Sequence, residues 1–317
     1  MNGHHFSKMK LFCGSSHQEL GTKVANELGI KLGKVQLSTF SCGELYARIE
    51  ETIRGKEAFI LQTITQEPNN DYMELFLMID ALKRSSASKI HVIIPHFGYA
   101  RQDKKSAPRE PISSRLISDL LSAVGFNRLI TMDLHSDQIQ GFFNQPVDHL
   151  TALPLFIDHF SKKNISDLVV VAPDTGRAKF AKRLADKLHA SLAVMHKTRP
   201  NHNQAEITNV IGDVEGKNVL IVDDMVDTGG SVISGIKALK EFNCKDAYLA
   251  TTHAVFSGPC IDRLKNSDFK EIVITDTIPP SEKIKTIENL SILSTAKTFA
   301  ETIKRNYENK SISSLFA

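Results

Sequence analysis

The sequence lacks the features that mark several large classes of protein. Its 317 residues contain only 4 Cys and no C-x-x-C pair, which argues against a zinc site and a disulfide framework and fits a reducing cytoplasm. The formal net charge is only +3, so there is no electrostatic reason to expect a nucleic-acid or membrane-surface partner. With 17 Gly and 11 Pro, the composition is neither linker-like nor collagenous.

Long apolar runs are also missing. Stretches such as Val219–Val222 and Leu168–Ala172 fall far short of the roughly 20 residues that span a bilayer, so we expect no membrane helix. Residues 1–8 lack the apolar core of a signal peptide, and we expect the ordered fold to begin near Met9. The 41% hydrophobic and 24% charged residues are typical of a globular protein, and the length suggests two domains.

Short apolar runs alternate with helix-like stretches, which predicts an α/β fold with mainly parallel sheets flanked by helices. The rhythm starts again after Val147, so the predicted domains are residues 9–150 and 151–317. The apolar side chains near the end of the chain suggest that the last residues dock back on the first domain. The predicted strands are Lys10–Cys13, Lys34–Leu37, Ala58–Gln62, Lys89–Pro95, Arg128–Met132, Leu168–Ala172, Ser191–Met195, Asn218–Val222, Ala247–Thr251 and Glu271–Thr275.

Two helices are predicted from apolar stripes at helical spacing. One follows Pro111 and stops at Gly125, and the other opens at Ser231 and ends before Phe242. We expect both stripes to pack on a sheet as core. Their members are Leu116, Ile117, Leu120, Leu121 and Val124 in the first helix, and Val232, Ile233, Ile236 and Leu239 in the second.

The strongest local signal for function is an apolar strand that ends in acidic residues and runs into a loop of small residues. Val219–Val222 is followed by Asp223, Asp224, Asp227, Thr228, Gly229, Gly230 and Ser231. At a helix start, backbone N–H groups and the helix dipole hold phosphate, and the Thr and Ser hydroxyls add donors. The two adjacent carboxylates suit vicinal sugar hydroxyls or a hydrated magnesium ion. A helix cap with an ordinary turn is the alternative, but so many carboxylates after an apolar strand favour a sugar-phosphate site.

Two common nucleotide motifs are absent. The nearest approach to a Walker A loop, residues 212–218, has one residue too few between its glycines and Asn218 where Ser or Thr is required. No G-x-G-x-x-G follows a strand. An ordinary kinase and a nicotinamide dehydrogenase are therefore not supported.

The loop resembles the phosphoribosyl diphosphate-binding motif of type I phosphoribosyltransferases, and the chain almost end to end resembles the ribose-phosphate diphosphokinase family. The segments that carry the resemblance are Phe12–His17, Phe40–Glu44, Tyr99–Lys105, Met132–His135, Gln138–Phe143, Pro173–Asp174 and Ser257–Pro259. It implies two tandem phosphoribosyltransferase-like domains, the first for ATP and the second for ribose 5-phosphate. A phosphoribosyltransferase that consumes phosphoribosyl diphosphate is the weaker interpretation, because it would leave the first half unexplained.

The resemblance also implies roles for single residues. Phe40 would stack on adenine and, with Glu44, would be offered to a neighbouring subunit's site. Lys197 and Arg199 would be catalytic and lie on a flexible loop, while His135 and Asp174 would hold Mg²⁺. ATP would be bound by Phe40, Cys42, Glu44, Arg101 and Gln102, and ribose 5-phosphate by Asp223, Asp224, Asp227, Thr228, Gly229, Gly230 and Ser231.

The reaction implied is transfer of the diphosphoryl group of Mg-ATP to ribose 5-phosphate, giving phosphoribosyl diphosphate and AMP for nucleotide, histidine and tryptophan biosynthesis. The resemblance further implies a cytoplasmic homo-oligomer, a hexamer built from dimers, with phosphate and ADP as effectors at Arg54, Ser311 and Ser313. A non-catalytic nucleotide-binding regulatory homologue is the alternative. Departures from the family's pattern stand at Cys42, Ser106 and Arg177.

Overall fold

The computed structural model describes residues 6–201 and 204–315, with the backbone alone for residues 197–201 and 204–208. The chain folds into two compact units. Unit 1 contains the described residues up to Thr151, Thr277–Pro279 and the described residues from Ser294 onward; unit 2 contains Ala152–Asp276 and Pro280–Leu293. In the described part of the chain, no helix is long and apolar enough to cross a membrane.

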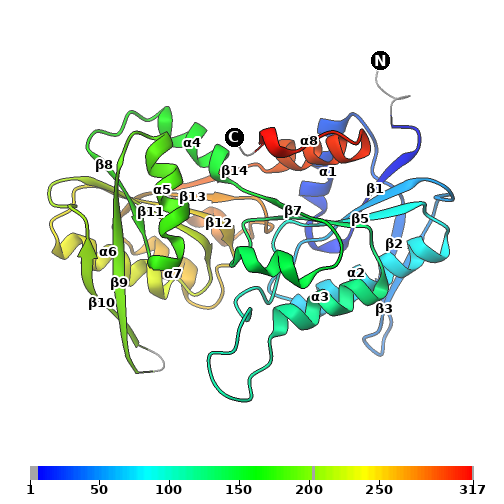
Figure 1. Ribbon diagram of the computed structural model, residues 1–317, viewed down its shortest axis with the longest axis horizontal. Coiled ribbons are helices and arrows are strands. Elements are labelled where there is room, and N and C mark those ends of the chain that lie inside the picture. The colour runs from blue at the N-terminus through cyan, green and yellow to red at the C-terminus, as the bar shows by residue number, and fades with distance from the viewer. Residues whose placement is uncertain (1–5, 202–203, 316–317) are drawn as a thin grey trace. The chain divides into compact units, whose positions relative to one another are not determined.

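Unit 1 is built on a parallel sheet with the order β1-β4-β5-β6-β7. Its strands are β1 (Met9–Cys13), β4 (Glu57–Leu61), β5 (Lys89–Ile94), β6 (Arg128–Met132) and β7 (Val147–Leu150). Its helices are α1 (Gln18–Leu28), α2 (Pro68–Arg84), α3 (Ser113–Val124) and α8 (Ala296–Tyr307), with 3₁₀ turns η1 (Ser15–His17), η2 (Asp137–Phe142) and η5 (Ser313–Leu315). In Figure 1, α1 and α8 lie on one side of this sheet and α2 and α3 on the other.

The C-terminal helix α8 belongs to unit 1, although most of the chain between Thr151 and its first residue, Ala296, lies in unit 2. Its buried Phe299 and Ile303 lie on the face that packs against α1. Asn306 Nδ2 donates to Asp148 Oδ2 at 2.8 Å, which ties the helix to β7.

Unit 2 contains a larger sheet with the order β10-β9-β8-β11-β12-β13-β14, in which only β10 runs antiparallel to its neighbour. Its strands are β8 (Leu168–Ala172), β9 (Ser191–Asn201), β10 (Gln204–Ile211), β11 (Asn218–Val226), β12 (Ala247–Ala254), β13 (Phe269–Thr275) and β14 (Leu290–Leu293). Its helices are α4 (Leu153–Ser161), α5 (Ala178–Lys187), α6 (Gly230–Glu241) and α7 (Cys260–Lys265), with 3₁₀ turns η3 (Thr175–Arg177) and η4 (Ile284–Thr286).

Strand β11 shows why the runs in unit 2 are continuously apolar. Its side chains alternate between the two faces of the sheet, and Val219 and Ile221 pack in one core cluster with Val232 and Ile236 of α6. Leu220, on the opposite face, is also fully buried. Because both faces of β11 are covered, its side chains are apolar at successive positions and do not alternate between apolar and polar.

The predicted α/β class with mainly parallel sheets is confirmed, and all the predicted strands form. One of them, β2 (Val35–Thr39), does not join the parallel sheet but pairs antiparallel with β3 (Leu45–Ile49) in a hairpin of its own. Both strands are only partly buried, which explains why β3 carries no clear apolar run. The prediction that the whole stripe of α3 is core is wrong, because Leu116 and Leu120 are 55% and 42% exposed while Ile117 and Leu121 are buried.

Candidate functional site

The carboxyl end of β11 carries the two adjacent carboxylates. β11 lies between β8 and β12 in the interior of the sheet, and the crevice beyond the carboxyl ends of parallel strands is where such folds bind ligands. Asp224 is almost fully buried, and its backbone N–H donates to Asp223 Oδ1 at 2.9 Å. Burial raises the pKa of Asp223 well above its ordinary value, the charge of Asp224 raises it further, and the Arg177 guanidinium opposes both effects.

Arg177 forms ion pairs with both carboxylates. Its Nη2 lies 2.7 Å from Asp224 Oδ2, and its Nε lies 3.7 Å from Asp223 Oδ1. In the sequence, Arg177 stands out only as a departure from the pattern of the family that the chain resembles. The pairing with the acidic strand end depends on the neighbouring positions of β8 and β11, which the sequence does not reveal.

The loop that follows β11 has the geometry of an anion site. Gly229 adopts φ +75°, a left-handed conformation that favours glycine, and it precedes the first residue of α6 without giving that helix a side-chain cap. The Thr228 and Ser231 side chains are exposed. A helix start without a side-chain cap, flanked by two exposed hydroxyl side chains, is the kind of arrangement at which proteins bind phosphate.

Two residues from the segment after β12 hold this loop in place, and sequence reasoning gave neither a role. The Ser257 hydroxyl donates to Asp227 Oδ1, and the Ser257 N–H donates to the Asp227 carbonyl at 3.0 Å. Arg263 Nη1 of α7 donates to the Thr228 carbonyl at 2.8 Å. Ser257 could have been noticed because it belongs to a segment that carries the resemblance, whereas Arg263 has no such signal.

Replacing Arg263 with alanine is expected to raise the KM for ribose 5-phosphate by about three- to tenfold, since a charge-assisted hydrogen bond of this kind contributes about 1 kcal/mol. The loop would lose the hydrogen bond from Arg263 but keep the two hydrogen bonds from Ser257. Steady-state kinetics measure the effect, and Lys265→Ala, on the same helix and also exposed, is the matched control. An equal rise of KM in both variants would show that the hydrogen bond from Arg263 to the loop has no specific role.

Asp174 lies at the end of β8 and caps η3, because its Oδ1 accepts from the Arg177 N–H at 3.2 Å. Asp174 thus acts as an N-cap, and its side chain is exposed. Among the described side chains, no group of three or more His, Cys, Asp or Glu is arranged to hold a metal ion. His135, the other predicted metal ligand, is exposed and belongs to unit 1.

Phe40, Cys42 and Glu44 lie in the turn between β2 and β3. The Phe40 N–H donates to the Glu44 carbonyl at 2.8 Å, and the Phe40 ring is 53% exposed, with an edge contact to Tyr46 at 5.7 Å between ring centroids. An aromatic ring held by the backbone but left open to solvent is suited to stacking on a flat ligand. Phe40 is therefore not part of the hydrophobic core.

Chemical labelling of Cys42 is expected to report ATP binding by this turn. Cys42 is the one exposed cysteine, whereas burial raises the pKa of the Cys13 and Cys260 thiols to about 12 and leaves them unreactive. Iodoacetamide should modify Cys42 first, and saturating Mg-ATP should slow that reaction, as mass spectrometry of the digested protein would show. An unchanged rate with Mg-ATP would contradict the assignment of this turn to the nucleotide.

Arg101 and Gln102 lie in unit 1, in the long connection between β5 and α3. Gln102 fixes the start of α3, since its carbonyl accepts from the Ser114 N–H at 3.2 Å and its Oε1 accepts from the Ser113 hydroxyl at 2.5 Å. Within unit 1, this connection and the tip of the β2–β3 hairpin lie well apart (Figure 1). The tip of the hairpin and this connection are thus separate parts of unit 1.

Lys197 and Arg199 fall on the backbone of β9, which pairs with β10 as an antiparallel hairpin. Their side chains lie outside the described residues. The segment expected to be a flexible loop is thus described as a paired strand as far as Asn201.

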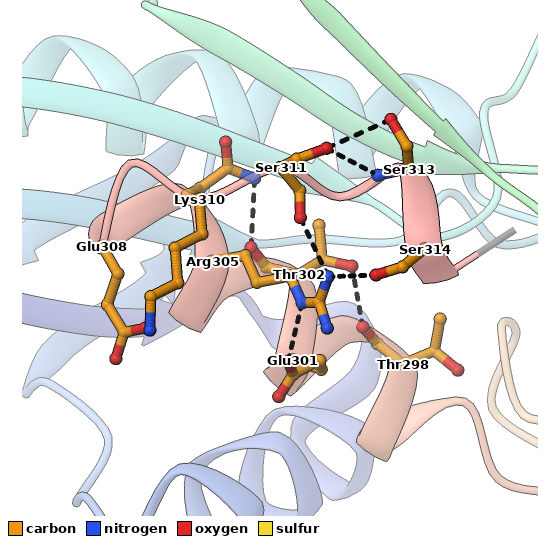
Figure 2. Close-up of polar contacts among 10 residues, drawn as sticks. Thr298, Glu301, Thr302, Arg305, Glu308, Lys310, Ser311, Ser313 and Ser314 are labelled. Atoms are coloured by element: carbon orange, nitrogen blue, oxygen red, sulfur yellow. Dashed lines mark hydrogen bonds and ion pairs between the residues drawn. The ribbon is translucent and has the colours of Figure 1, made fainter.

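The three predicted regulatory residues are all in unit 1. Arg54 is exposed in the turn before β4. Figure 2 shows Ser311 and Ser313 in the segment after α8, where their hydroxyls lie 3.1 Å apart. Arg305 Nη1 donates to the Ser311 carbonyl at 2.9 Å and to the Ser314 hydroxyl, so α8 itself fixes the path of this segment (Figure 2).

Comparison with known proteins matches both halves of the chain. A family model described as the N-terminal domain of ribose phosphate pyrophosphokinase matches residues 9–125, and one described as a phosphoribosyl synthetase-associated domain matches residues 199–317. A ribose-phosphate pyrophosphokinase of Fusobacterium nucleatum subsp. nucleatum is 48% identical over 313 residues, which cover 98% of this chain and 99% of that protein. One of Caldanaerobacter subterraneus subsp. tengcongensis is 46% identical over 311 residues, 98% of each chain.

The fold has an equally extensive match. The crystal structure of phosphoribosylpyrophosphate synthetase from Mycobacterium smegmatis superposes with a TM-score of 0.90 at 42% identity, covering 96% of this chain and 100% of that one. The similarity therefore includes both units and their sheets.

Proposed function

The chain belongs to the ribose-phosphate pyrophosphokinase family, and from that membership we propose that it transfers the diphosphoryl group of ATP to ribose 5-phosphate. The anomeric hydroxyl of the sugar attacks the β-phosphorus, the bond from that phosphorus to the α-phosphate oxygen breaks, and AMP leaves. The hydroxyl proton is released, and phosphoribosyl diphosphate forms. The feature that carries the proposal is the continuous segment from Asp223 to Ser231, in which a half-buried and a buried carboxylate are followed by a helix start without a side-chain cap.

Unit 2 supplies the sugar site in this proposal. The N–H groups at the start of α6 and the Thr228 and Ser231 hydroxyls bind the 5-phosphate, while Asp223 and Asp224 accept hydrogen bonds from the ring hydroxyls. Asp227 keeps the loop in this shape through Ser257. No nucleophile or covalent intermediate is needed, because catalysis of this transfer depends on positioning and on charge stabilisation.

The remaining residues serve the nucleotide. We assign the adenine and phosphates of ATP to Phe40, Cys42, Glu44, Arg101 and Gln102, with the Phe40 turn serving a neighbouring subunit. The separation of that turn from the connection before α3 supports this division. Lys197 and Arg199 act on the transferring group, where cations that arrive with the substrate neutralise charge that develops in the transition state.

We assign Mg²⁺ to Asp174 of unit 2 and His135 of unit 1, each as an exposed side chain beside an ion that the substrate mainly holds. Magnesium usually takes one or two carboxylates, several waters and the phosphates of its nucleotide, so no cage of protein ligands is needed. When bound, Mg²⁺ neutralises charge on the phosphate oxygens.

The proposal extends to the assembly and its setting. In a homohexamer built from dimers, contacts between subunits would cover the exposed Leu116 and Leu120 of α3. The four free cysteines fit a cytoplasmic protein. Arg54, Ser311 and Ser313 would bind phosphate or ADP as effectors. The products would supply nucleotide, histidine and tryptophan synthesis.

The test is the identity of the products. Purified protein incubated with ATP, Mg²⁺ and ribose 5-phosphate should give AMP and phosphoribosyl diphosphate, which phosphorus NMR distinguishes from all other phosphates present. ADP as the nucleotide product would indicate transfer of a single phosphoryl group. No turnover, with tight ATP binding retained, would favour the regulatory homologue.

A further inference from the structure

Arg177 occupies the acidic strand end of unit 2. Its side chain is only 15% exposed, and its Nη2 lies 2.7 Å from an oxygen of Asp224, whose side chain is 2% exposed. This is an ion pair largely removed from solvent, which is uncommon unless it meets a specific need.

The backbone around Arg177 holds the guanidinium in place. The Arg177 N–H donates to both the side chain and the carbonyl of Asp174, at 3.2 and 3.3 Å, in the turn η3 that leads directly into α5. The side chain therefore starts from a fixed turn at the end of β8 and reaches across to the neighbouring strand β11. Both ends of the bridge lie in unit 2.

A nearby cation stabilises the charged forms of Asp223 and Asp224. Asp223 and Asp224 are adjacent, and both are removed from bulk water, so each carboxylate disfavours the charge of the other. Burial and the Asp224 charge raise the pKa of Asp223, whereas the Arg177 charge and the hydrogen bond from the Asp224 N–H lower it. A protonated Asp is a donor where a sugar hydroxyl requires an acceptor.

We propose that Arg177 is a positioning residue for ribose 5-phosphate, an internal counter-ion that keeps Asp223 and Asp224 charged and oriented to accept hydrogen bonds from the sugar hydroxyls. This rests on the proposed function of the acidic pair. Arg177 acts through Asp224, and it stabilises the sugar in the ground state and the transition state alike. Its loss therefore changes KM for the sugar and leaves kcat unchanged.

The experiment is a double-mutant cycle with R177Q, D224N and R177Q/D224N, in which kcat and the KM values for ribose 5-phosphate and Mg-ATP are measured in the full-length protein. R177Q should raise the KM for ribose 5-phosphate by about tenfold or more, with kcat and the KM for Mg-ATP within about twofold of the parent. In the D224N background the same change should add less than about twofold, because the partner through which Arg177 acts is gone.

Two further variants separate this role from a general effect on folding. R177K retains a cation and should keep the KM for ribose 5-phosphate within about threefold of the parent, although it loses the planar fork of arginine. R177A removes the charge with a smaller side chain and should raise the KM for ribose 5-phosphate as much as R177Q does. It replaces R177Q in the cycle if thermal melting shows that R177Q is unstable.

Three results would overturn the proposal. Full additivity in the cycle would show that Arg177 acts independently of Asp224. A fall in kcat with unchanged KM would place Arg177 on the transferring group. A parental KM for ribose 5-phosphate in D224N would reject the assignment of the acidic pair itself, and the inference with it, whereas the first two results reject the inference alone.

Discussion

Replacing Lys197 with alanine is expected to lower kcat by about 10²- to 10³-fold, the usual effect of removing one group that stabilises transition-state charge. The KM values for ribose 5-phosphate and Mg-ATP should change little, because the charge that Lys197 would neutralise develops only as the diphosphoryl group transfers. The measurement is the steady-state rate of AMP formation, with the concentration of each substrate varied up to saturation so that both kcat and KM are obtained.

The matched control for Lys197 is Lys187→Ala, which removes an exposed lysine from α5 in the same unit. It should leave kcat within about twofold of the parent, as surface substitutions away from a site usually do. An increase in KM with an unchanged kcat for Lys197→Ala would move this residue from catalysis to simple binding.

Replacing Gly229 with alanine is expected to raise the KM for ribose 5-phosphate by at least about tenfold, equivalent to about 1.4 kcal/mol. Gly229 has φ +75°, and an added Cβ would lie 3.0 Å from Cys260 Sγ, so either the loop or the buried α7 residue beneath it must shift. The N–H groups at the start of α6 would then no longer converge on one phosphate. The KM for Mg-ATP should stay near that of the parent.

Gly216→Ala provides the control for backbone strain. Gly216 has φ +65°, close to that of Gly229, but an added Cβ there would meet nothing within 4 Å. Both substitutions should cost about 1 kcal/mol or more of stability in thermal or urea unfolding, since both force alanine into the left-handed region. Only Gly229→Ala should affect the sugar phosphate; a similar KM in the two variants would argue against a phosphate site at this loop.

The acidic end of β11 and the start of α6, where we propose the sugar site, were predictable as structural features because their sequence signals are local. A strand covered on both faces, as β11 is, must be continuously apolar, so the change to Asp223 and Asp224 stands out in the sequence. The start of α6 was equally readable, because a glycine in the left-handed conformation and small polar residues occur at adjacent positions. The end of α3 at Gly125, with φ +101°, follows from the same property of glycine.

What the sequence did not reveal depends on contacts between distant positions. The edge strands β10 and β14 are short or partly exposed and show no distinctive apolar run. The ion pair of Arg177 with Asp224 and the hydrogen bond from Arg263 to the Thr228 carbonyl each require two distant segments to be adjacent. Nothing near either arginine in the sequence identifies its partner. The antiparallel pairing of β2 with β3 is likewise a choice of neighbour, which strand propensity alone does not determine.

The most direct measurement is a crystal structure of the protein with ribose 5-phosphate bound. The account predicts the 5-phosphate within hydrogen-bond distance of the N–H groups at residues 229–231 and of the Thr228 and Ser231 hydroxyls, with the ring hydroxyls donating to Asp223 and Asp224. A sugar phosphate that is well ordered elsewhere, with this loop bound only to solvent, would contradict it.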